Sequence, residues 1–308
     1  MGKHIPVLLN ESIEGLNIKA DGIYVDCTLG GGGHSSAILA KLTTGHLYSF
    51  DQDQYAIKVA EERLKEVGSN FTIINSNFEH IKSELLSRGI TSVDGILYDL
   101  GVSSFQFDIP SRGFSYNYDA YLDMRMNQEA TLDAYYVVNN YSEEELRKIL
   151  FEYGEEKFAR NIARLIVRER ATKPIRTTFE LVDIIKKALP AAVKRNIGHP
   201  AKQTFQALRI EVNGELKVLK KSLEDALELL NSGGRVAVIS FHSLEDRIVK
   251  QIFKKNVTLD LPKGLPFIPQ GYEIKYRLIN NKVIVPTTQE VEENNRSRTA
   301  KLRIIERI

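Results

Sequence analysis

"YVDCTLGGGGHSSAIL", residues 24–39, places four consecutive glycines between a short apolar run and a helix-like segment. Each glycine costs backbone entropy on folding, so such a cluster calls for a specific reason. In a doubly wound sheet, ligands bind beyond the carboxyl ends of the strands, where a glycine-rich first turn lets the backbone approach them closely. The stretch therefore predicts the first strand, turn and helix of a fold of this kind, with Gly30 to Gly33 in the ligand-binding turn.

The spacing of the glycines argues against two common nucleotide-binding motifs. In a G-x-G-x-x-G fingerprint that starts at Gly30 or Gly31, the third glycine would fall on Ser35 or Ser36. This mismatch weakens the interpretation as an NAD site. A P-loop is excluded more firmly, because no Gly-Lys-Ser/Thr follows the turn.

Short β-rich runs alternate with helical patterns over the first hundred residues, which is typical of a parallel sheet with crossover helices. The predicted strands are Ile23 to Cys27, Leu47 to Asp51, Phe71 to Asn75 and Val93 to Leu100, with helices at about 34–43, 54–67 and 78–88. A loop and helices follow before Gly233 to Phe241 resumes the strand pattern. We therefore predict a core domain formed by residues 1–104 and 201–308, with an inserted helical subdomain at 105–200. The tail offers two more strands, Lys282 to Val285 and Ala300 to Ile305, and a loop at Pro262 to Gly271.

Composition indicates a folded protein, with 43% hydrophobic and 27% charged residues in a chain of 308. The first residues contain no apolar stretch long enough for a signal peptide or a membrane span, so we expect a cytoplasmic protein without a membrane partner. The single cysteine, Cys27, cannot form an internal disulfide. "SFHSLEDR" (240–247) predicts a strand-to-helix corner at which Ser243 caps the helix. We predict no metal site there, because His242 has no second histidine nearby.

Positive charge is concentrated in one part of the chain. Residues 157–217 hold 14 Lys and Arg against five Asp and Glu, although the whole chain carries a formal charge of only +2. This asymmetry favours a polyanionic partner for that segment. A solvated helix face would explain it as well.

Three side chains at predicted strand ends suggest a nucleoside ligand. Asp51 can accept hydrogen bonds from both ribose hydroxyls, as in NAD enzymes, and Phe78 can pack on an adenine or serve as a core aromatic. Asp99 follows the apolar run Ile96-Leu97-Tyr98 at the carboxyl edge of the sheet, where an acid costs free energy unless it is paired or functional. S-adenosylmethionine, with its sulfonium and ammonium groups, favours an acidic cleft lined by glycine. A helix or turn cap is the alternative role for Asp99.

The chain resembles the bacterial small-subunit (16S) ribosomal RNA cytosine-N4 methyltransferases, the RsmH/MraW family, over essentially its whole length. The resemblance rests on a series of stretches that occur in order along the chain. They are "HIPVLLNE" (4–11), "DCTLGGGGHS" (26–35), "DGILYDLGVSSFQFD" (94–108), "RGFS" (112–115), "LDMRM" (122–126), "YGEEKFARNIARLIV" (153–167), "HPAKQTFQALRIEVNGEL" (199–216), "GGRVAVISFHSLEDRIVK" (233–250) and "RSRTAKLR" (296–303).

The resemblance implies the class I S-adenosylmethionine-dependent methyltransferase fold, a Rossmann-like seven-stranded α/β sheet with a helical insertion after the fourth strand. Its cofactor contacts fall on Gly32, Gly33, His34, Asp51, Phe78, Asp99 and Gln106. Two departures are visible. Ala120-Tyr121 stand where the family usually has Gly-Pro, which puts the geometry of that loop in doubt, and Asn295 replaces the usual proline before Arg296.

The implied reaction is N4-methylation of a specific cytidine in the 16S ribosomal RNA of the small ribosomal subunit, in the decoding region. The amine is a poor nucleophile, so it must be oriented and must lose a proton. The candidates for this work are Asp99, with Ser103 and Ser104 as secondary choices. Aromatic side chains such as Tyr121 can receive a base that leaves its stack. Arg160, Arg164 and Arg168 recur every four residues on one helix face, where they can follow an RNA backbone or form a solvated face.

Two other functions fit parts of the sequence. A ribosome-assembly factor that binds RNA without catalysis would account for the basic segment, and a methyltransferase for a non-RNA acceptor would account for the fold. Transfer of a methyl group to RNA discriminates among the three. The sequence leaves open whether the protein is a monomer or a homodimer.

Overall fold

A computed structural model describes residues 6–190, 198–258 and 273–308. The chain divides into two compact units. The sheet unit comprises Met1–Gly101 and Leu216–Ile308, and the helical unit comprises Val102–Glu215. The second boundary lies after Glu215 and not at the predicted residue 200, because the helix that follows Pro200 packs on other helices of the helical unit. The predicted loop at Pro262 to Gly271 lies outside the described residues.

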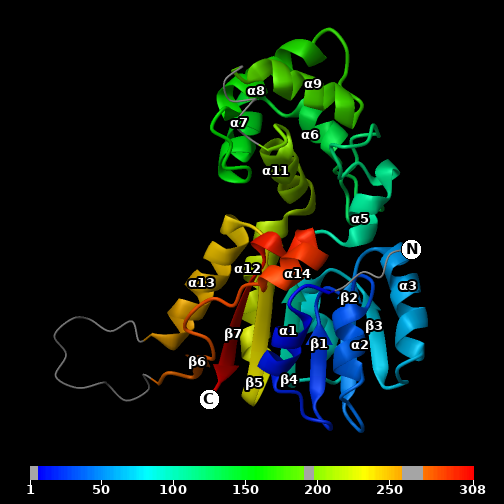
Figure 1. The fold of residues 1–308 in the computed structure, drawn as a ribbon, viewed down its shortest axis with the longest axis vertical. Coiled ribbons are helices and arrows are strands. Elements are labelled where there is room, and N and C mark those ends of the chain that lie inside the picture. Colours follow the sequence, from blue (N-terminus) through cyan, green and yellow to red (C-terminus); the bar gives the residue numbers. More distant parts are fainter. Residues whose placement is uncertain (1–5, 191–197, 259–272) are drawn as a thin grey trace, which may run out of the picture. The chain divides into compact units, whose positions relative to one another are not determined.

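The sheet unit is built on seven strands in the order β3-β2-β1-β4-β5-β7-β6 (Figure 1). They are β1 (Ile23–Asp26), β2 (His46–Asp51), β3 (Phe71–Asn75), β4 (Val93–Asp99), β5 (Leu230–Ser240), β6 (Tyr276–Leu278) and β7 (Lys301–Arg307). Strands β1 to β5 run parallel, whereas β7 is antiparallel to both of its neighbours. The predicted α/β fold with a seven-stranded sheet is confirmed.

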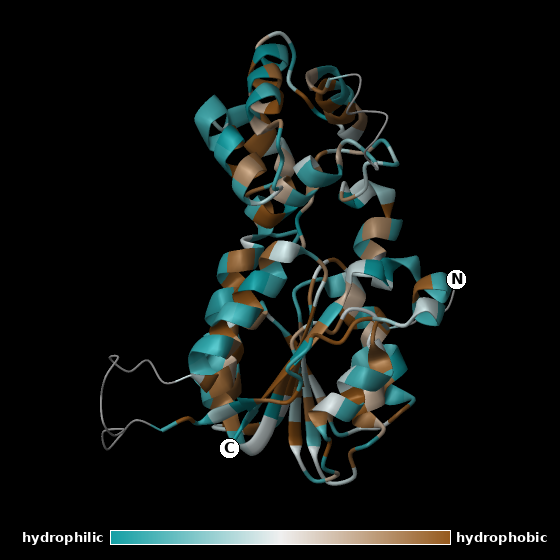
Figure 2. Ribbon diagram, turned by 60° about the vertical axis from the view of Figure 1, so that its left-hand side comes forward, coloured by the Kyte–Doolittle hydropathy of each residue, from teal (hydrophilic) through white to brown (hydrophobic). Residues whose placement is uncertain are grey.

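Helices cover both faces of this sheet. They are α1 (Leu9–Leu16), α2 (Gly33–Leu39), α3 (Gln54–Lys65), α4 (Ile81–Leu86), α12 (Glu215–Leu229) and α13 (Ser243–Val257). The unit also contains α14 (Thr288–Glu293) and the 3₁₀ helices η1 (Phe78–His80) and η3 (Asn295–Thr299). Side chains alternate along β4, so that Ile96 and Tyr98 pack with α4, α12 and α13, while Leu97 packs with α1, α2 and α3. The central strands are accordingly hydrophobic (Figure 2). Burial on both faces explains why the strands appear in the sequence as nearly continuous apolar runs.

The tail differs from its prediction. The predicted strand Lys282 to Val285 contributes only one isolated bridge, from Ile284 to Leu302. The edge of β7 is paired instead with the unpredicted strand β6, in which Leu278 lies opposite Ile305. Since a strand edge can pair only once along its length, residues 282–285 are left with a single contact to it.

The helical unit has a hydrophobic core of its own. Its helices are α5 (Ser104–Asp108), η2 (Pro110–Arg112), α6 (Ala134–Asn140), α7 (Glu143–Glu152), α8 (Ala159–Arg170), α9 (Thr178–Ala188) and α11 (Lys202–Asn213). The "LDMRM" segment is fixed from α11, because Asn213 accepts a hydrogen bond from the Met126 amide at 2.8 Å and donates one to the Met124 carbonyl at 2.8 Å. None of the helices within the described ranges is both long and apolar enough to cross a lipid bilayer.

Candidate functional site

The order of the strands places the candidate site at one edge of the sheet. β1 lies between β2 and β4. The chain continues from β1 to β2 and β3 on one side and then returns to β4 and β5 on the other side, so the strand order reverses at β1. In open α/β sheets this switch point, at the carboxyl ends of the strands, is where ligands bind. Four segments of the sheet unit meet at this edge: the glycine turn after β1, Asp51 at the end of β2, Phe78 after β3 and Asp99 at the end of β4.

The glycine turn has two positions that exclude a side chain. Gly32 adopts a positive φ of 74°, which residues with a Cβ rarely adopt. At Gly33 an added Cβ would lie 2.3 Å from Cγ of Pro6, far inside van der Waals contact. The turn therefore requires glycine at both positions.

Asp51 is held by backbone donors. Its Oδ2 accepts a hydrogen bond from the Gly30 amide at 2.9 Å, and its Oδ1 accepts one from the Asp53 amide at 2.9 Å. Burial raises the pKa of Asp51 to about 6, although these two hydrogen bonds act in the opposite direction. Each carboxylate oxygen can accept more than one hydrogen bond, so both remain able to accept from ribose hydroxyls. The first glycine of the turn thus orients the predicted ribose acceptor.

Phe78 occupies η1, directly after β3. Its ring meets the ring of Tyr98 edge-on, with 5.6 Å between the centroids, and its carbonyl accepts a hydrogen bond from the Ser222 hydroxyl at 2.8 Å. Asn77, just before it, donates from Nδ2 to Oε1 of Gln52 at 3.2 Å. This bond links the segment that follows β2 to the segment that follows β3. Sequence reasoning did not single out Gln52 or Asn77.

Asp99 is the last residue of β4, and its carboxylate is not fully hydrogen-bonded within the described residues. Among the described residues, no group forms a hydrogen bond with its Oδ1, which is shielded from solvent. Burial raises the pKa of Asp99 well above its usual range, and the nearby charges of Asp26 and Glu245 raise it further. A shielded acceptor without a partner is costly in a stable fold. The oxygen therefore points to a ligand or to a reacting group.

A buried polar network that sequence reasoning missed holds Asp99. The Asp99 amide donates to Oγ1 of Thr28 at 2.7 Å. Thr28 is in turn fixed by Asp26, whose Oδ1 accepts from the Thr28 amide at 3.0 Å and whose Oδ2 accepts from the Ser35 hydroxyl at 2.6 Å. Asp26 is fully buried. The glycine-turn segment thereby sets the position of the acid one strand away.

Replacing Thr28 by valine tests this network. Valine keeps the shape but removes the hydroxyl, which leaves the Asp99 amide without its acceptor. We expect the free energy of unfolding to fall by about 1–3 kcal/mol, the usual cost of an unsatisfied buried polar group. Denaturant unfolding of this variant, beside Thr28→Ser as the control that retains the hydroxyl, measures the effect. Equal stability of the valine and serine variants would contradict the role of the hydroxyl.

His34 lies beside Asp99. Its Nε2 is 3.0 Å from the Val7 carbonyl, an acceptor, so Nε2 carries a hydrogen. Its Nδ1 therefore faces Oδ2 of Asp99, at 3.5 Å. A lone pair on Nδ1 facing a carboxylate would be repulsive, so the pair is favourable when it holds one proton, on Asp99 or on His34. The two side chains form an acid–base pair at the end of β4.

The remaining predicted cofactor and catalytic residues lie in the helical unit. Ser103 and Gln106 form a capping box for α5: the Ser103 amide donates to Oε1 of Gln106 at 3.1 Å, and the Gln106 amide donates to the Ser103 hydroxyl at 3.4 Å. Gln106 is buried. The side chain of Ser104 lies outside the described part of the structure. The structure thus gives Ser103 and Gln106 a helix-capping role.

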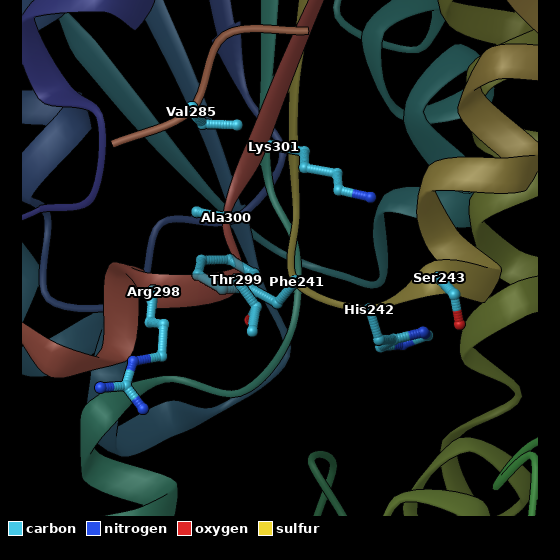
Figure 3. A pocket seen from close by; sticks show the side chains of 8 residues that line it. All are labelled: Phe241, His242, Ser243, Val285, Arg298, Thr299, Ala300 and Lys301. Atoms are coloured by element: carbon cyan, nitrogen blue, oxygen red, sulfur yellow. The ribbon is translucent and has the colours of Figure 1, made fainter. Parts of the chain in front are cut away.

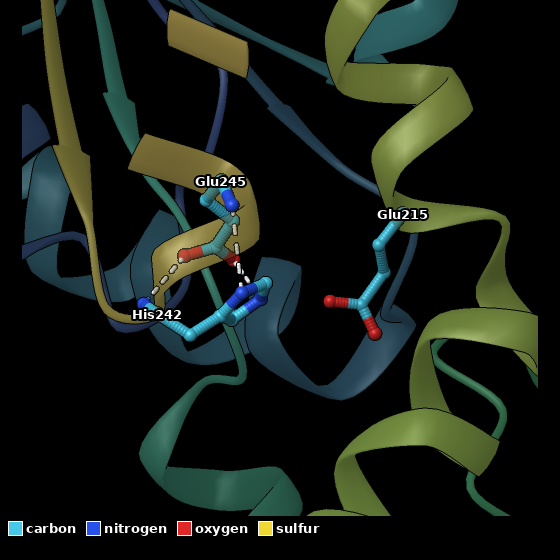
Figure 4. A group of neighbouring side chains, drawn as sticks. All are labelled: Glu215, His242 and Glu245. Carbon is cyan, nitrogen blue, oxygen red and sulfur yellow. Dashed lines mark hydrogen bonds and ion pairs between the residues drawn. The ribbon is translucent and has the colours of Figure 1, made fainter. Parts of the chain in front are cut away.

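The corner after β5 is capped by a residue other than the predicted Ser243. His242 is the N-cap of α13, and its Nδ1 accepts from the Glu245 amide at 3.5 Å (Figure 4). Oε2 of Glu245 accepts in return from the amides of Phe241 and His242, at 2.8 and 3.3 Å. Glu215, also drawn there, belongs to the helical unit. The cap falls one residue earlier than predicted because the H-S-L-E spacing lets His242 and Glu245 satisfy each other's backbone.

The three predicted arginines share the exposed face of α8, while Ile162, Ala163 and Ile166 on its other face are buried. Within the described residues, Arg160 and Arg164 have no ion pair, whereas Arg168 pairs with Glu169 at 2.9 Å.

Tyr121 is 46% exposed, and its hydroxyl donates to Oδ2 of Asp133 at 3.0 Å. Its ring stacks on that of Tyr135, with 5.6 Å between the centroids. Burial, followed by the bond to Asp133, raises the pKa of Tyr121 to about 12. The Ala120-Tyr121 pair is tied to α9, because the Ala120 amide donates to Oγ1 of Thr178 at 3.0 Å. This anchor fixes the loop at the position where the sequence departs from the family pattern.

The residues of the sheet edge fit S-adenosylmethionine. Asp51 offers acceptors for two ribose hydroxyls, and Oδ1 of Asp99, which has no partner within the described residues, offers a further polar contact to the ligand. A nicotinamide dinucleotide would share the ribose contact. It would not require an unpartnered acid at the end of β4.

Comparisons with known proteins show the family to which the chain belongs. The model of the MraW methylase family matches residues 1–308. The chain is 57% identical to the ribosomal RNA small subunit methyltransferase H of Exiguobacterium sibiricum over 309 residues, which covers 100% of this chain and 99% of that protein.

Among solved structures, an rRNA methylase from Streptococcus thermophilus is 12% identical with a TM-score of 0.43, over 97% of this chain and 93% of that one. TrmN from Thermus thermophilus is 13% identical with a TM-score of 0.42, over 98% of this chain and 48% of that one. The full-length family match and the 57% identity decide the assignment. The chain belongs to the MraW methylase family and is an S-adenosylmethionine-dependent methyltransferase.

Proposed function

We propose that this protein methylates the exocyclic N4 of a specific cytidine in the 16S ribosomal RNA, in the decoding region of the small ribosomal subunit. The observation that carries the proposal is the 57% identity, over both full lengths, to a ribosomal RNA small subunit methyltransferase. In the cell we place the protein in the cytoplasm, where its substrate is assembled. The unsatisfied Asp99 at the sheet edge supplies the chemistry that an amine acceptor needs.

The acceptor amine must lose one proton as its nitrogen gains the methyl carbon. S-adenosylmethionine supplies that methyl on a sulfonium sulfur, which leaves as a thioether. We assign the proton to Asp99, whose Oδ1 has no hydrogen-bond partner among the described residues. Since its pKa is raised well above the usual range, Asp99 is a stronger base than an ordinary aspartate. His34 at 3.5 Å holds the carboxyl in place and shares its proton.

The helical unit is the part that we assign to RNA recognition. Its α8 presents Arg160 and Arg164 to solvent without ion pairs within the described residues, so both guanidinium groups are available to phosphates. Arg168, paired with Glu169, is a weaker candidate. Tyr121, half exposed and fixed by Asp133, can stack on a base that has left the RNA helix.

Methyl transfer tests the proposal directly. Radiolabelled S-adenosylmethionine is incubated with small subunits that carry unmodified RNA, with the free RNA, and with protein and small-molecule acceptors. We expect label in the ribosomal RNA alone. RNA that binds at stoichiometric levels without label would favour an assembly factor, and label in the other acceptors would favour a different methyltransferase.

Charge reversal on α8 tests the role of the helical unit. In the Arg160→Glu/Arg164→Glu variant, two phosphate contacts become repulsive, so we expect the KM for small subunits to rise by about 10–100-fold. The Kd for S-adenosylmethionine should stay within twofold of the wild-type value. Lys148→Glu, an exposed cation on α7, is the matched control. An unchanged KM for the double variant would remove α8 from the RNA-binding surface.

A further inference from the structure

The sheet unit contains a cavity away from the glycine turn. It measures about 350 Å³ and lies between the end of β5 and the start of β7 (Figure 3). Phe241, Val285 and Ala300 give it an apolar lining, and Arg298 and Lys301 add two cationic groups. Its volume is at the lower end of the range for sites that hold a small organic ligand.

The cavity lies close to Asp99, in the same sheet unit. β5 pairs with β4 so that Ile239 lies opposite Asp99, and it pairs with β7 so that Ser240 lies opposite Lys301. The cavity therefore begins at the edge of the sheet where β4 ends. A Cβ added to Gly101, two residues after Asp99, would lie 3.6 Å from Cδ2 of Phe241.

The two cationic side chains are available to an anion. Arg298 is exposed, and the described part of the chain offers it no ion pair. Within the described ranges, Lys301 forms one ion pair, in which its Nζ donates to Oδ2 of Asp246 at a distance of 3.5 Å. Asp246 is already bound by Arg303, whose Nε and Nη2 donate to its two carboxylate oxygens at 2.7 and 3.2 Å. The charge of Asp246 is thus largely offset by Arg303, and the cavity keeps a net positive lining.

The apolar lining suits a flat ring. Phe241 presents an aromatic side chain in the cavity, and Val285, 55% exposed, adds an apolar surface that solvent otherwise covers. Base–aromatic contacts stabilise single-stranded RNA on proteins without regard to sequence. A cavity that combines such a surface with two cations is suited to one nucleotide, with its base on the apolar side and the phosphates on either side of it near one cation each.

We propose that this cavity binds a nucleotide of the RNA strand that flanks the methylated cytidine, with its base against Phe241. Arg298 and Lys301 point to opposite sides of the cavity, so each would hold a different phosphate of the strand (Figure 3). The inference rests on the proposed function and extends it to a subsite in the sheet unit. By holding the strand next to the reacting residue, the subsite would keep the target amine in register with Asp99.

Charge-neutral variants of the two cations test the subsite. For Arg298→Gln/Lys301→Gln we expect the KM for small subunits to rise about tenfold, since charge-assisted contacts are lost. The kcat should stay within twofold, and so should the Kd for S-adenosylmethionine. The slope of log Kd against log salt for a single-stranded RNA carrying the target sequence should fall by about 0.7 for each lost contact. Lys254→Gln, an exposed cation of α13, is the control expected to change none of these quantities.

A crosslink provides a second readout that does not depend on turnover. RNA with 5-iodouridine beside the target cytidine is irradiated with the protein, and we expect the modified peptide to contain Phe241. An unchanged KM and salt slope in the double variant, or a crosslink only to other peptides, would overturn the subsite. If the wild-type protein binds RNA but transfers no methyl group to it, the proposed function fails. The binding and crosslinking data still show whether the cavity binds RNA.

Discussion

Asp99→Asn is expected to lower kcat by about 10²–10⁴-fold, the usual contribution of a positioned general base. Asparagine preserves the shape of the side chain but cannot take a proton from the acceptor amine. The Kd for S-adenosylmethionine, measured by calorimetry, should rise much less than kcat falls. A variant that binds the methyl donor poorly but reaches the wild-type rate at saturation would assign Asp99 to donor binding alone.

The pH dependence of the wild-type rate provides an independent check on Asp99. Because burial raises the pKa of this carboxyl, the fraction in the basic form increases only as the pH rises through that elevated value. We expect kcat to increase with pH, and the midpoint of this rising limb should lie above the usual pKa range of an aspartate. The residual activity of Asp99→Asn should lack this limb. An identical pH profile in both proteins would contradict the assignment of the proton to Asp99.

Asp51→Asn is expected to raise the Kd for S-adenosylmethionine by about 10–100-fold, because hydrogen bonds to a charged acceptor are each worth about 1.5–3 kcal/mol. The amide would also disturb the hydrogen bond that Asp51 accepts from the Gly30 amide. Glu224→Gln, an exposed carboxylate on α12, is the control and should bind normally. Wild-type affinity in Asp51→Asn would remove Asp51 from the ribose site.

The same residue predicts the pH dependence of donor binding. The pKa of Asp51 is raised to about 6, so the carboxylate that accepts from the ribose hydroxyls is lost as the pH falls through that value. We expect the wild-type Kd to increase between pH 7 and pH 5. At each pH, the wild-type Kd is divided by the Kd of Asp51→Asn, so that any effect of titration of the ligand itself cancels. A ratio that is constant over this range would contradict the titration of Asp51 in the site.

The sequence was sufficient to predict the parts of the site that follow from strand ends. Phe71 to Asn75 matches β3, and Asp51 ends β2 as predicted. β4 ends at Asp99, one residue before the predicted end at Leu100. Parallel strands buried on both faces produce apolar runs, and the first polar residue after each run marks the edge of the sheet. This rule places Asp51, Phe78 and Asp99 together without knowledge of any distance.

The parts that were missed depend on contacts between distant segments. Asp26 and Thr28 stand in the glycine-turn segment, and only the pairing of β1 with β4 reveals that Thr28 accepts from the Asp99 amide. The capping role of Ser103 was visible in principle, because the S-x-x-Q spacing to Gln106 is a capping-box pattern. The boundary after Glu215 could not be predicted, since Pro200 interrupts the helical pattern although α11 packs within the helical unit.

The position of the transferred methyl group tests the central claim most directly. Small subunits with unmodified RNA are incubated with the wild-type protein and with Asp99→Asn, and the RNA is then digested to nucleosides for mass spectrometry. We expect N4-methylcytidine, at one position, from the wild-type protein and about 10²–10⁴-fold more slowly from the variant. Methylation on a ring carbon or on the ribose, or equal rates for the two proteins, would contradict an amine acceptor activated by Asp99.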